Sequence, residues 1–169
     1  MREIAAKARR CAVTEPLIGG YDYADAFEVD LAGGDTRPAG QVFQAGLVGA
    51  PRVLRRTVLI AHRYLLRFRL GPASGGDDVF GWQILTREPD VIRLQAAGPL
   101  MRGVLVARRI GPTRAALTTS LYYERPRLAR IIWAIVGPLH RRIAPYLLER
   151  AGRPASPRRH RSGDRLSPQ

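Results

Sequence analysis

The chain has 169 residues, of which 46% are hydrophobic and 25% are charged. Globular proteins have about 45–50% apolar and about 25% charged residues, and most single domains contain about 100–200 residues. The composition therefore predicts one domain with a packed core, and it excludes a chain that is disordered throughout.

Basic residues outnumber acidic ones by 28 to 14, which gives a formal net charge of +14 and a pI near 11.4. An excess of this kind is typical of proteins that bind nucleic acid or an anionic membrane surface. Lys7 is the only lysine, however, and Ala, Gly, Pro and Arg are abundant throughout the chain. This pattern fits a GC-rich coding sequence equally well, so both interpretations of the charge stay open.

The number and spacing of the cysteines and histidines exclude several classes of site. Cys11 is the only cysteine, so no intrachain disulfide or multi-cysteine zinc site can form. His62, His140 and His160 are far apart and lack the spacing of metal ligands. No secretory signal is visible at the N-terminus, and no run approaches the ~18 apolar residues that span a bilayer. We therefore expect a cytoplasmic protein without a metal ion or cofactor.

Residues 1–19 are expected to form an N-terminal leader. Residues 3–10 have the pattern of a short amphipathic helix, and Pro16 and the glycines at 19 and 20 end any regular element. The next segment, YDYADAFEVDL, has the period of a half-buried strand. Its two alternating sets are Tyr23, Asp25, Phe27, Val29 and Leu31 on one face, and Ala24, Ala26, Glu28 and Asp30 on the other.

A helical pair is predicted over residues 39–70. The break AGGDTRP offers a helix start at Thr36 or Asp35, just before Pro38. The first helix is short, around residues 41–48, and VGAP separates it from the second. In the second helix apolar residues recur at spacings near three and four, while arginines mostly occupy the other positions. The second helix is therefore expected to be amphipathic, with an arginine-rich outer side.

Four strands are expected after the loop GPASGGDD. They cover residues 79–87, 91–97, 101–110 and 114–125. The separators EPD, GPL and GPT contain the Pro, Gly and Asp residues of tight connections. Strands that follow one another at about 10 residues predict an antiparallel meander.

A long amphipathic helix is predicted to begin near Pro126. Its apolar stripe consists of Leu128, Ile131, Ile132, Ile135, Leu139, Ile143 and Leu147. Pro138 removes one intrahelical hydrogen bond, so we expect a bend that fits the helix to its sheet. Residues 152–169 are polar, basic and rich in Pro and Ser, which predicts a disordered basic tail after a domain over residues 20–151.

One strand, a helical pair, a meander and a long helix make an α+β order rather than a βα alternation. The expected architecture is a helix-grip fold, in which a curved antiparallel sheet wraps around the long C-terminal helix. The segments LTTSLYYERP and ARIIWAIVGPLHRRIAPYLLERA, with a proline and a His-Arg pair in the second, resemble the START-like, or polyketide-cyclase-like (SRPBCC), superfamily. They are most similar to an uncharacterised bacterial family within it. RFRLGP and GWQILTREPDVIRL fall in the corresponding places, so the likeness covers residues 21–151.

The resemblance implies an apolar ligand between helix and sheet, because members of the superfamily hold lipids, sterols or aromatic polyketides there. A cavity of at least about 300 Å³ is expected for such a site. Aromatic rings, strand hydroxyls and the His-Arg pair provide the candidate ligand-binding residues. These are Trp82, Thr118, Ser120, Tyr122, Trp133, His140 and Arg141.

No catalytic set is identified, because the chain lacks a Gly-rich phosphate loop, a nucleophile-elbow serine and a close carboxylate pair. We therefore expect a soluble binding protein for an apolar small molecule or lipid. A cyclase or dehydratase on the same fold is one alternative, with His140 as its acid or base. The other alternative is a basic interaction protein, whose C-terminal arginines give weak, nonspecific binding to nucleic acid or an anionic membrane.

Overall fold

The computed structural model describes residues 7–15, 19–72 and 78–153. Within these residues, seven strands form one antiparallel sheet in the order β1-β2-β7-β6-β5-β4-β3. The strands are β1 (Arg9–Cys11), β2 (Tyr23–Asp30), β3 (Asp78–Val79), β4 (Trp82–Arg87), β5 (Val91–Ala97), β6 (Met101–Ile110) and β7 (Arg114–Tyr123). The helical elements are α1 (Ala39–Val48), α2 (Arg52–Ile60), the π-helical turn η1 (Ala61–Leu65) and α3 (Pro126–Ala151).

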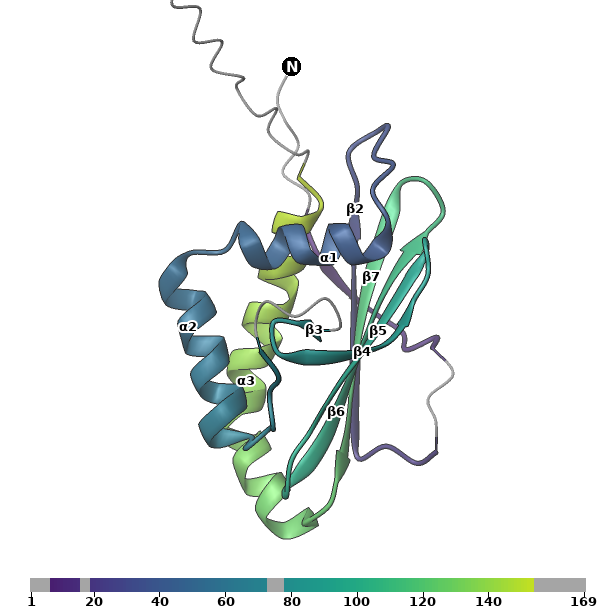
Figure 1. Cartoon of the computed structure of the whole chain (residues 1–169). Helices are drawn as coiled ribbons and strands as arrows, with labels where there is room; N and C mark the ends of the chain where they lie inside the picture. Colours follow the sequence, from purple (N-terminus) through teal and green to yellow (C-terminus); the bar gives the residue numbers. More distant parts are fainter. Residues whose placement is uncertain (1–6, 16–18, 73–77, 154–169) are drawn as a thin grey trace, which may run out of the picture.

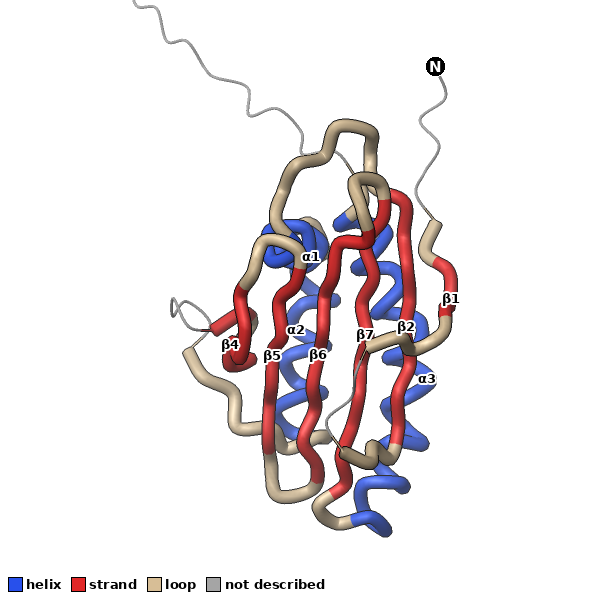
Figure 2. Tube along the Cα trace, turned by 90° about the vertical axis from the view of Figure 1, so that its right-hand side faces the viewer, coloured by secondary structure: helices blue, strands red, loops and turns tan. Residues whose placement is uncertain are grey.

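The helices cover one face of the curved sheet (Figure 2). α3 contacts β2 and β7, and α1 crosses the C-terminal part of α3 (Figure 1). This is the α+β helix-grip arrangement that the order of elements predicts, with the helical pair inserted after the first long strand. The fold prediction is therefore confirmed.

The meander follows the predicted strands with one change near its start. β5 and β6 have the predicted bounds, and β7 ends two residues earlier than expected, at Tyr123. The run predicted over residues 79–87 is divided by a two-residue turn at Phe80 and Gly81, both of which have positive φ. Positive φ at both central residues is the geometry of a hairpin turn that matches the twist of the strands.

The helical pair is confirmed, but its boundaries differ from the predicted ones. α1 begins after Pro38 without a side-chain N-cap, so neither Thr36 nor Asp35 starts the helix. α2 continues directly into η1, which ends before Phe68. Such π-helical turns occur frequently at functional sites, and η1 carries His62.

α3 packs on the sheet mainly through small residues and one tryptophan. Its buried residues are Ala129, Trp133, Val136, Gly137, Ala144, Leu148 and Ala151. The exposed members of the predicted apolar stripe are Leu128, Ile131, Ile135 and Leu139. The larger aliphatic residues on one side of α3 therefore face solvent, while the smaller residues let the helix approach its neighbours closely. A side chain on Gly46 of α1 would collide with the backbone carbonyl of Leu147.

The N-terminal segment is partly integrated into the domain. Arg9–Cys11 pair with β2 as an edge strand, so the helix predicted over residues 3–10 is wrong at its C-terminal end, and residues 1–6 lie outside the described part. Glu15 forms ion pairs with Arg108 and Arg93 on the outer face of the sheet. The tail predicted after residue 152 lies almost wholly outside the described residues, which end at 153.

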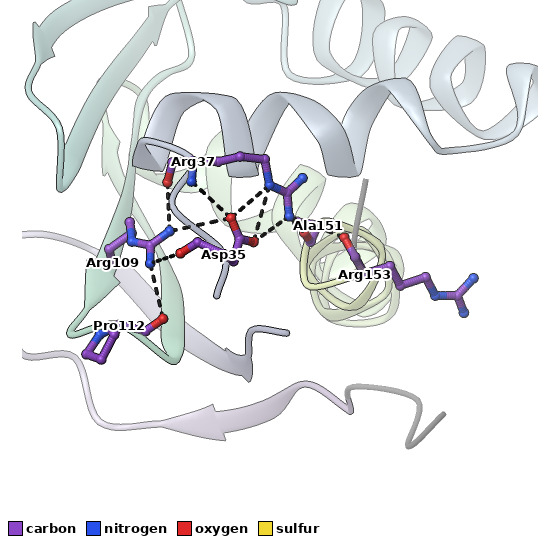
Figure 3. Close-up of polar contacts among 6 residues, drawn as sticks. All are labelled: Asp35, Arg37, Arg109, Pro112, Ala151 and Arg153. Atoms are coloured by element: carbon purple, nitrogen blue, oxygen red, sulfur yellow. Dashed lines mark hydrogen bonds and ion pairs between the residues drawn. The ribbon is translucent and has the colours of Figure 1, made fainter. Parts of the chain in front are cut away.

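A buried carboxylate and two arginines link the loop before α1, the C-terminal end of α3 and the β6–β7 turn at one end of the fold (Figure 3). The side chain of Asp35 is 5% exposed and accepts hydrogen bonds from the guanidinium of Arg37, at 2.6 Å from Nη2. The same guanidinium donates to the carbonyl of Ala151 at the end of α3. Arg109 on β6 donates to the backbone carbonyls of Asp35, Arg37 and Pro112. Arg37 holds the pKa of Asp35 below its usual value, so the carboxylate is charged at neutral pH.

Replacing this carboxylate by an amide should destabilise the fold. Asp35→Asn keeps the shape of the side chain but removes its charge, so we expect the free energy of unfolding to fall by about 2 kcal/mol. Urea denaturation at neutral pH measures the difference. The matched control is Asp30→Asn, because the Asp30 side chain is 59% exposed and lies 3.5 Å from Arg9. A change above about 1 kcal/mol in the control, or none at Asp35, would contradict this account of the network.

Candidate functional site

A narrow pocket lies between α3, the α2–η1 segment and the inner face of the sheet. Its volume is about 100 Å³, and its walls are mostly aliphatic and aromatic. Phe43 and Leu47 of α1 border it on one side, and Leu117 and Leu121 of β7 form part of its floor. Five polar or amphipathic groups interrupt this apolar lining. They are His62, Trp82, Thr119, Trp133 and His140.

His140 is anchored by a buried carboxylate behind it. Its Nε2 lies 3.3 Å from Oδ1 of Asp25, whose side chain is fully buried on β2. The hydroxyl of Tyr23 donates a hydrogen bond of 2.5 Å to the other carboxylate oxygen. Trp133 packs against the rings of both Tyr23 and His140, with centroids 4.8 and 5.3 Å away. The imidazole is thus fixed from two sides at the edge of the pocket.

The partners of Asp25 decide its charge. Burial alone raises the pKa of this carboxyl, but the hydrogen bonds from His140 and Tyr23 outweigh burial and hold the pKa below the usual value. Burial and the hydrogen bond to Asp25 raise the pKa of Tyr23 to about 12, so its hydroxyl stays a donor. An ionised Asp25 is a hydrogen-bond acceptor for Nε2 of His140, so in the neutral form of this imidazole the lone pair is on Nδ1. The pair has the arrangement of an oriented general base.

His62 forms the opposite side of the pocket. Nε1 of Trp82 donates to its Nδ1 at 3.3 Å, and the ring packs against Phe68 and Trp82. Burial, with a smaller contribution from the charge of His140, lowers the pKa of His62 to about 4. His62 is therefore neutral at neutral pH, and the Trp82 hydrogen bond places its proton on Nε2.

Two buried polar atoms beside the pocket have no hydrogen-bond partner among the described residues. They are Oγ1 of Thr119 and Nε1 of Trp133. Thr119 lies directly opposite Asp25 in the β2–β7 register, and it lines the same pocket as His140. A buried polar group without a partner costs about 1–3 kcal/mol, and a polar ligand atom in the pocket would supply a hydrogen bond to Thr119. Nε1 of Trp133 lies on the side of Gly137 and Arg141, which do not line the pocket.

The structure brings three of the seven predicted site residues to this pocket. Trp82, Trp133 and His140 line it. Arg141 is exposed outside the lining, and its guanidinium interacts with the Tyr23 hydroxyl.

The other three predicted residues, Thr118, Ser120 and Tyr122, are on the wrong face of β7 for this pocket. Side chains alternate along a strand, and the residues that reach the pocket are Leu117, Thr119 and Leu121. Thr118 instead borders the N-terminal segment, the Ser120 hydroxyl lies 3.5 Å from the Val104 carbonyl, and Arg102 stacks on Tyr122.

Sequence reasoning missed Asp25, Thr119 and His62 as members of the site. A signal was available for Asp25, because it shares a strand face with Phe27 and Val29, and a carboxylate on an apolar face needs a partner. No comparable local signal marks Thr119 or His62. The position of Thr119 depends on which face of β7 is turned to the pocket, and that of His62 depends on the π-helical turn.

Metal binding finds no support in the described part of the chain, which has no group of three or more His, Cys, Asp or Glu residues placed to hold an ion. Among the same residues, no helix has the length and apolar character needed to cross a membrane. Comparisons of the chain with protein-family models, with curated proteins and with solved structures find no match.

Removing the charge of Asp25 should destabilise the protein at neutral pH and much less in acid. The folded-state pKa is below the ordinary 3.8, so the ionised carboxylate stabilises the fold above that value and loses its effect as the pH falls further. We expect Asp25→Asn to lower the free energy of unfolding by about 3 kcal/mol at neutral pH. Urea denaturation over a pH series measures the gap between variant and wild type. A gap that does not narrow in acid would show that the charge is not the cause.

Proposed function

We propose that the protein binds a small, mostly apolar molecule that carries one polar group. The observation that carries this proposal is an apolar pocket lined by an anchored histidine and by Thr119, whose Oγ1 has no hydrogen-bond partner among the described residues. An apolar lining with a few convergent polar groups is the usual design of small-molecule sites. The resemblance of the closing strand and helix to START-like proteins supports the same class of function.

The volume limits the size of the ligand. At about 100 Å³ the pocket is smaller than the expected 300 Å³, which counts against a ligand of sterol or polyketide size in this conformation. An apolar cavity of about 150 Å³ accommodates benzene, so the pocket as it stands holds a few carbons, and a single ring requires a small expansion. A larger ligand requires α2 to move, and α2 contributes no buried residue that would resist such a movement.

Phenol and toluene are suitable probes, because they have similar shapes and differ in one hydroxyl group. We expect both to bind the wild-type protein, and Thr119→Val to shift the preference about tenfold toward toluene, since it removes a hydrogen-bond partner. Isothermal titration calorimetry measures both affinities.

A pair of substitutions on α3 tests whether the pocket is the binding site. Ala144 lines the pocket, and Ala134 is exposed on the same helix. Ala144→Leu should abolish binding of both probes, whereas Ala134→Leu should leave it unchanged. Absence of binding to the wild type, or equal binding to both variants, would contradict the proposal.

We also infer a second candidate function, proton transfer at a carbon next to a carbonyl group, which the Asp25–His140 pair favours. In this reaction Nδ1 of His140 takes the proton, and the electron pair of the C–H bond moves toward the carbonyl oxygen. The donor for that oxygen is Oγ1 of Thr119, which has no hydrogen-bond partner among the described residues. The proposed base and the proposed donor both belong to residues that line the same small pocket.

Deuterium exchange into cyclopentanone tests the second function without knowledge of the natural substrate. In D₂O the wild-type protein should accelerate loss of the α-proton signal in the NMR spectrum. His140→Gln should reduce the accelerated part of the rate about a hundredfold, because the base is lost. Arg142→Gln, which changes an exposed residue of the same helix outside the pocket, is the control. Exchange no faster than in buffer, or an unchanged rate in His140→Gln, would eliminate this function.

A further inference from the structure

α3 exposes a row of large aliphatic side chains on the side that does not pack on the sheet. Ile131 and Ile135 are 61% and 68% exposed, and Leu128 and Leu139 extend the row at 49% and 41%. Spacings of three or four residues place these side chains on one side of a helix. Single exposed leucines are common, but a contiguous exposed apolar row marks an interaction surface.

α2 and η1 present a second exposed row. Val53, Ile60 and Tyr64 are 78%, 46% and 69% exposed, and no residue of α2 is buried. α2 and α3 lie on the same side of the sheet (Figure 2) and border the same pocket, to which Leu139 also contributes. We call the two rows together the α2–α3 face.

The charges around the α2–α3 face are all of one sign. No acidic residue occurs between residues 36 and 76, or between 125 and 148. Arg56 and Arg63 lie beside the row of α2 and η1, and Arg127 and Arg142 lie near the two ends of the row of α3. Within the described ranges, none of these four guanidinium groups forms an ion pair. Their charges are available to an anionic partner.

We propose that the α2–α3 face docks on the surface of an anionic lipid bilayer. Helices that lie in the bilayer interface combine an apolar face with flanking cations, and arginine side chains pair with lipid phosphates while their stems lie along apolar surface. A second copy of the chain fits the rows less well, because it would bring the same positive charges together. Nucleic acid would pair with the arginines but leave the aliphatic rows in water.

Docking in this orientation turns the pocket edge formed by α2, η1 and α3 toward the lipid. The sheet then faces away from the bilayer. Docking depends on the exposed rows and the arginines, and it does not depend on whether the pocket binds a ligand.

Vesicle sedimentation of the full chain tests the proposal. We expect binding to vesicles of equal parts phosphatidylglycerol and phosphatidylcholine, weakening with salt, and much weaker binding to pure phosphatidylcholine. The double variant Ile131→Asp/Ile135→Asp should lower the partition coefficient more than tenfold, and Arg127→Gln/Arg142→Gln about tenfold. Leu85→Asp is the control, because Leu85 is 46% exposed on β4, outside the face, and should bind as wild type.

Three results would overturn the proposal. Unchanged binding of both double variants would assign any membrane affinity to other arginines, such as those of residues 154–169. Equal binding to both kinds of vesicle would remove the role of lipid charge. A stable dimer that Ile131→Asp/Ile135→Asp dissociates in sedimentation-velocity experiments would assign the face to a second copy. Thermal unfolding followed by circular dichroism verifies that each variant is folded, and the arginine variant leaves the apolar rows intact.

Discussion

The close packing of α3 against its neighbours is the constraint on which the rest of the structure depends. α3 approaches α1 through small residues near its C-terminal end, where a side chain on Gly46 would collide with the carbonyl of Leu147. Ala129, Ala144 and Ala151 are likewise small and buried along the helix. Between these small residues, the side of α3 that carries Trp133 and His140 faces β7, and the space between the helix and this strand is not completely filled. The pocket is therefore a consequence of how the helix is positioned, and the same small contacts leave the bulky side chains of α3 on its outer side.

Asp25 supplies the second constraint, because a buried carboxylate stabilises a fold only when its hydrogen bonds are satisfied. Its two oxygens bind the Tyr23 hydroxyl on the same strand and the imidazole of His140 on α3. This links β2 to the middle of the closing helix and fixes the ring at the pocket. At the C-terminal end of the helix, the guanidinium of Arg37 binds both the carboxylate of Asp35 and the carbonyl of Ala151. Polar contacts therefore set the position of α3 at two points, while apolar packing supplies most of its contact with the sheet.

Periodicity predicted the strands and helices well, because each element repeats its local pattern over enough residues. It failed where both sides of an element carry apolar residues. β7 is buried on both faces, so alternation does not show which side faces the pocket. The sequence therefore suggests Thr118 as a ligand-binding residue, whereas Thr119 lines the pocket. α3 has apolar residues on its buried and exposed sides, so its sequence pattern does not identify the packed face. β1 pairs through only three residues, too few for a recognisable strand pattern.

Folding requires only one apolar side on α3, the side that packs against the rest of the domain. A second apolar side that is exposed to water is unfavourable. Ile131 and Ile135 would lower the solubility of an otherwise neutral helix. On this helix the arginines oppose self-association through repulsion of like charges, without removing the apolar surface. In the proposed docking, the same arginines keep the exposed aliphatic row apart from that of another copy and leave it available to an anionic lipid surface. Guanidinium groups pair with phosphates through two hydrogen bonds more effectively than ammonium groups do, so a chain in which Lys7 is the only lysine fits this docking.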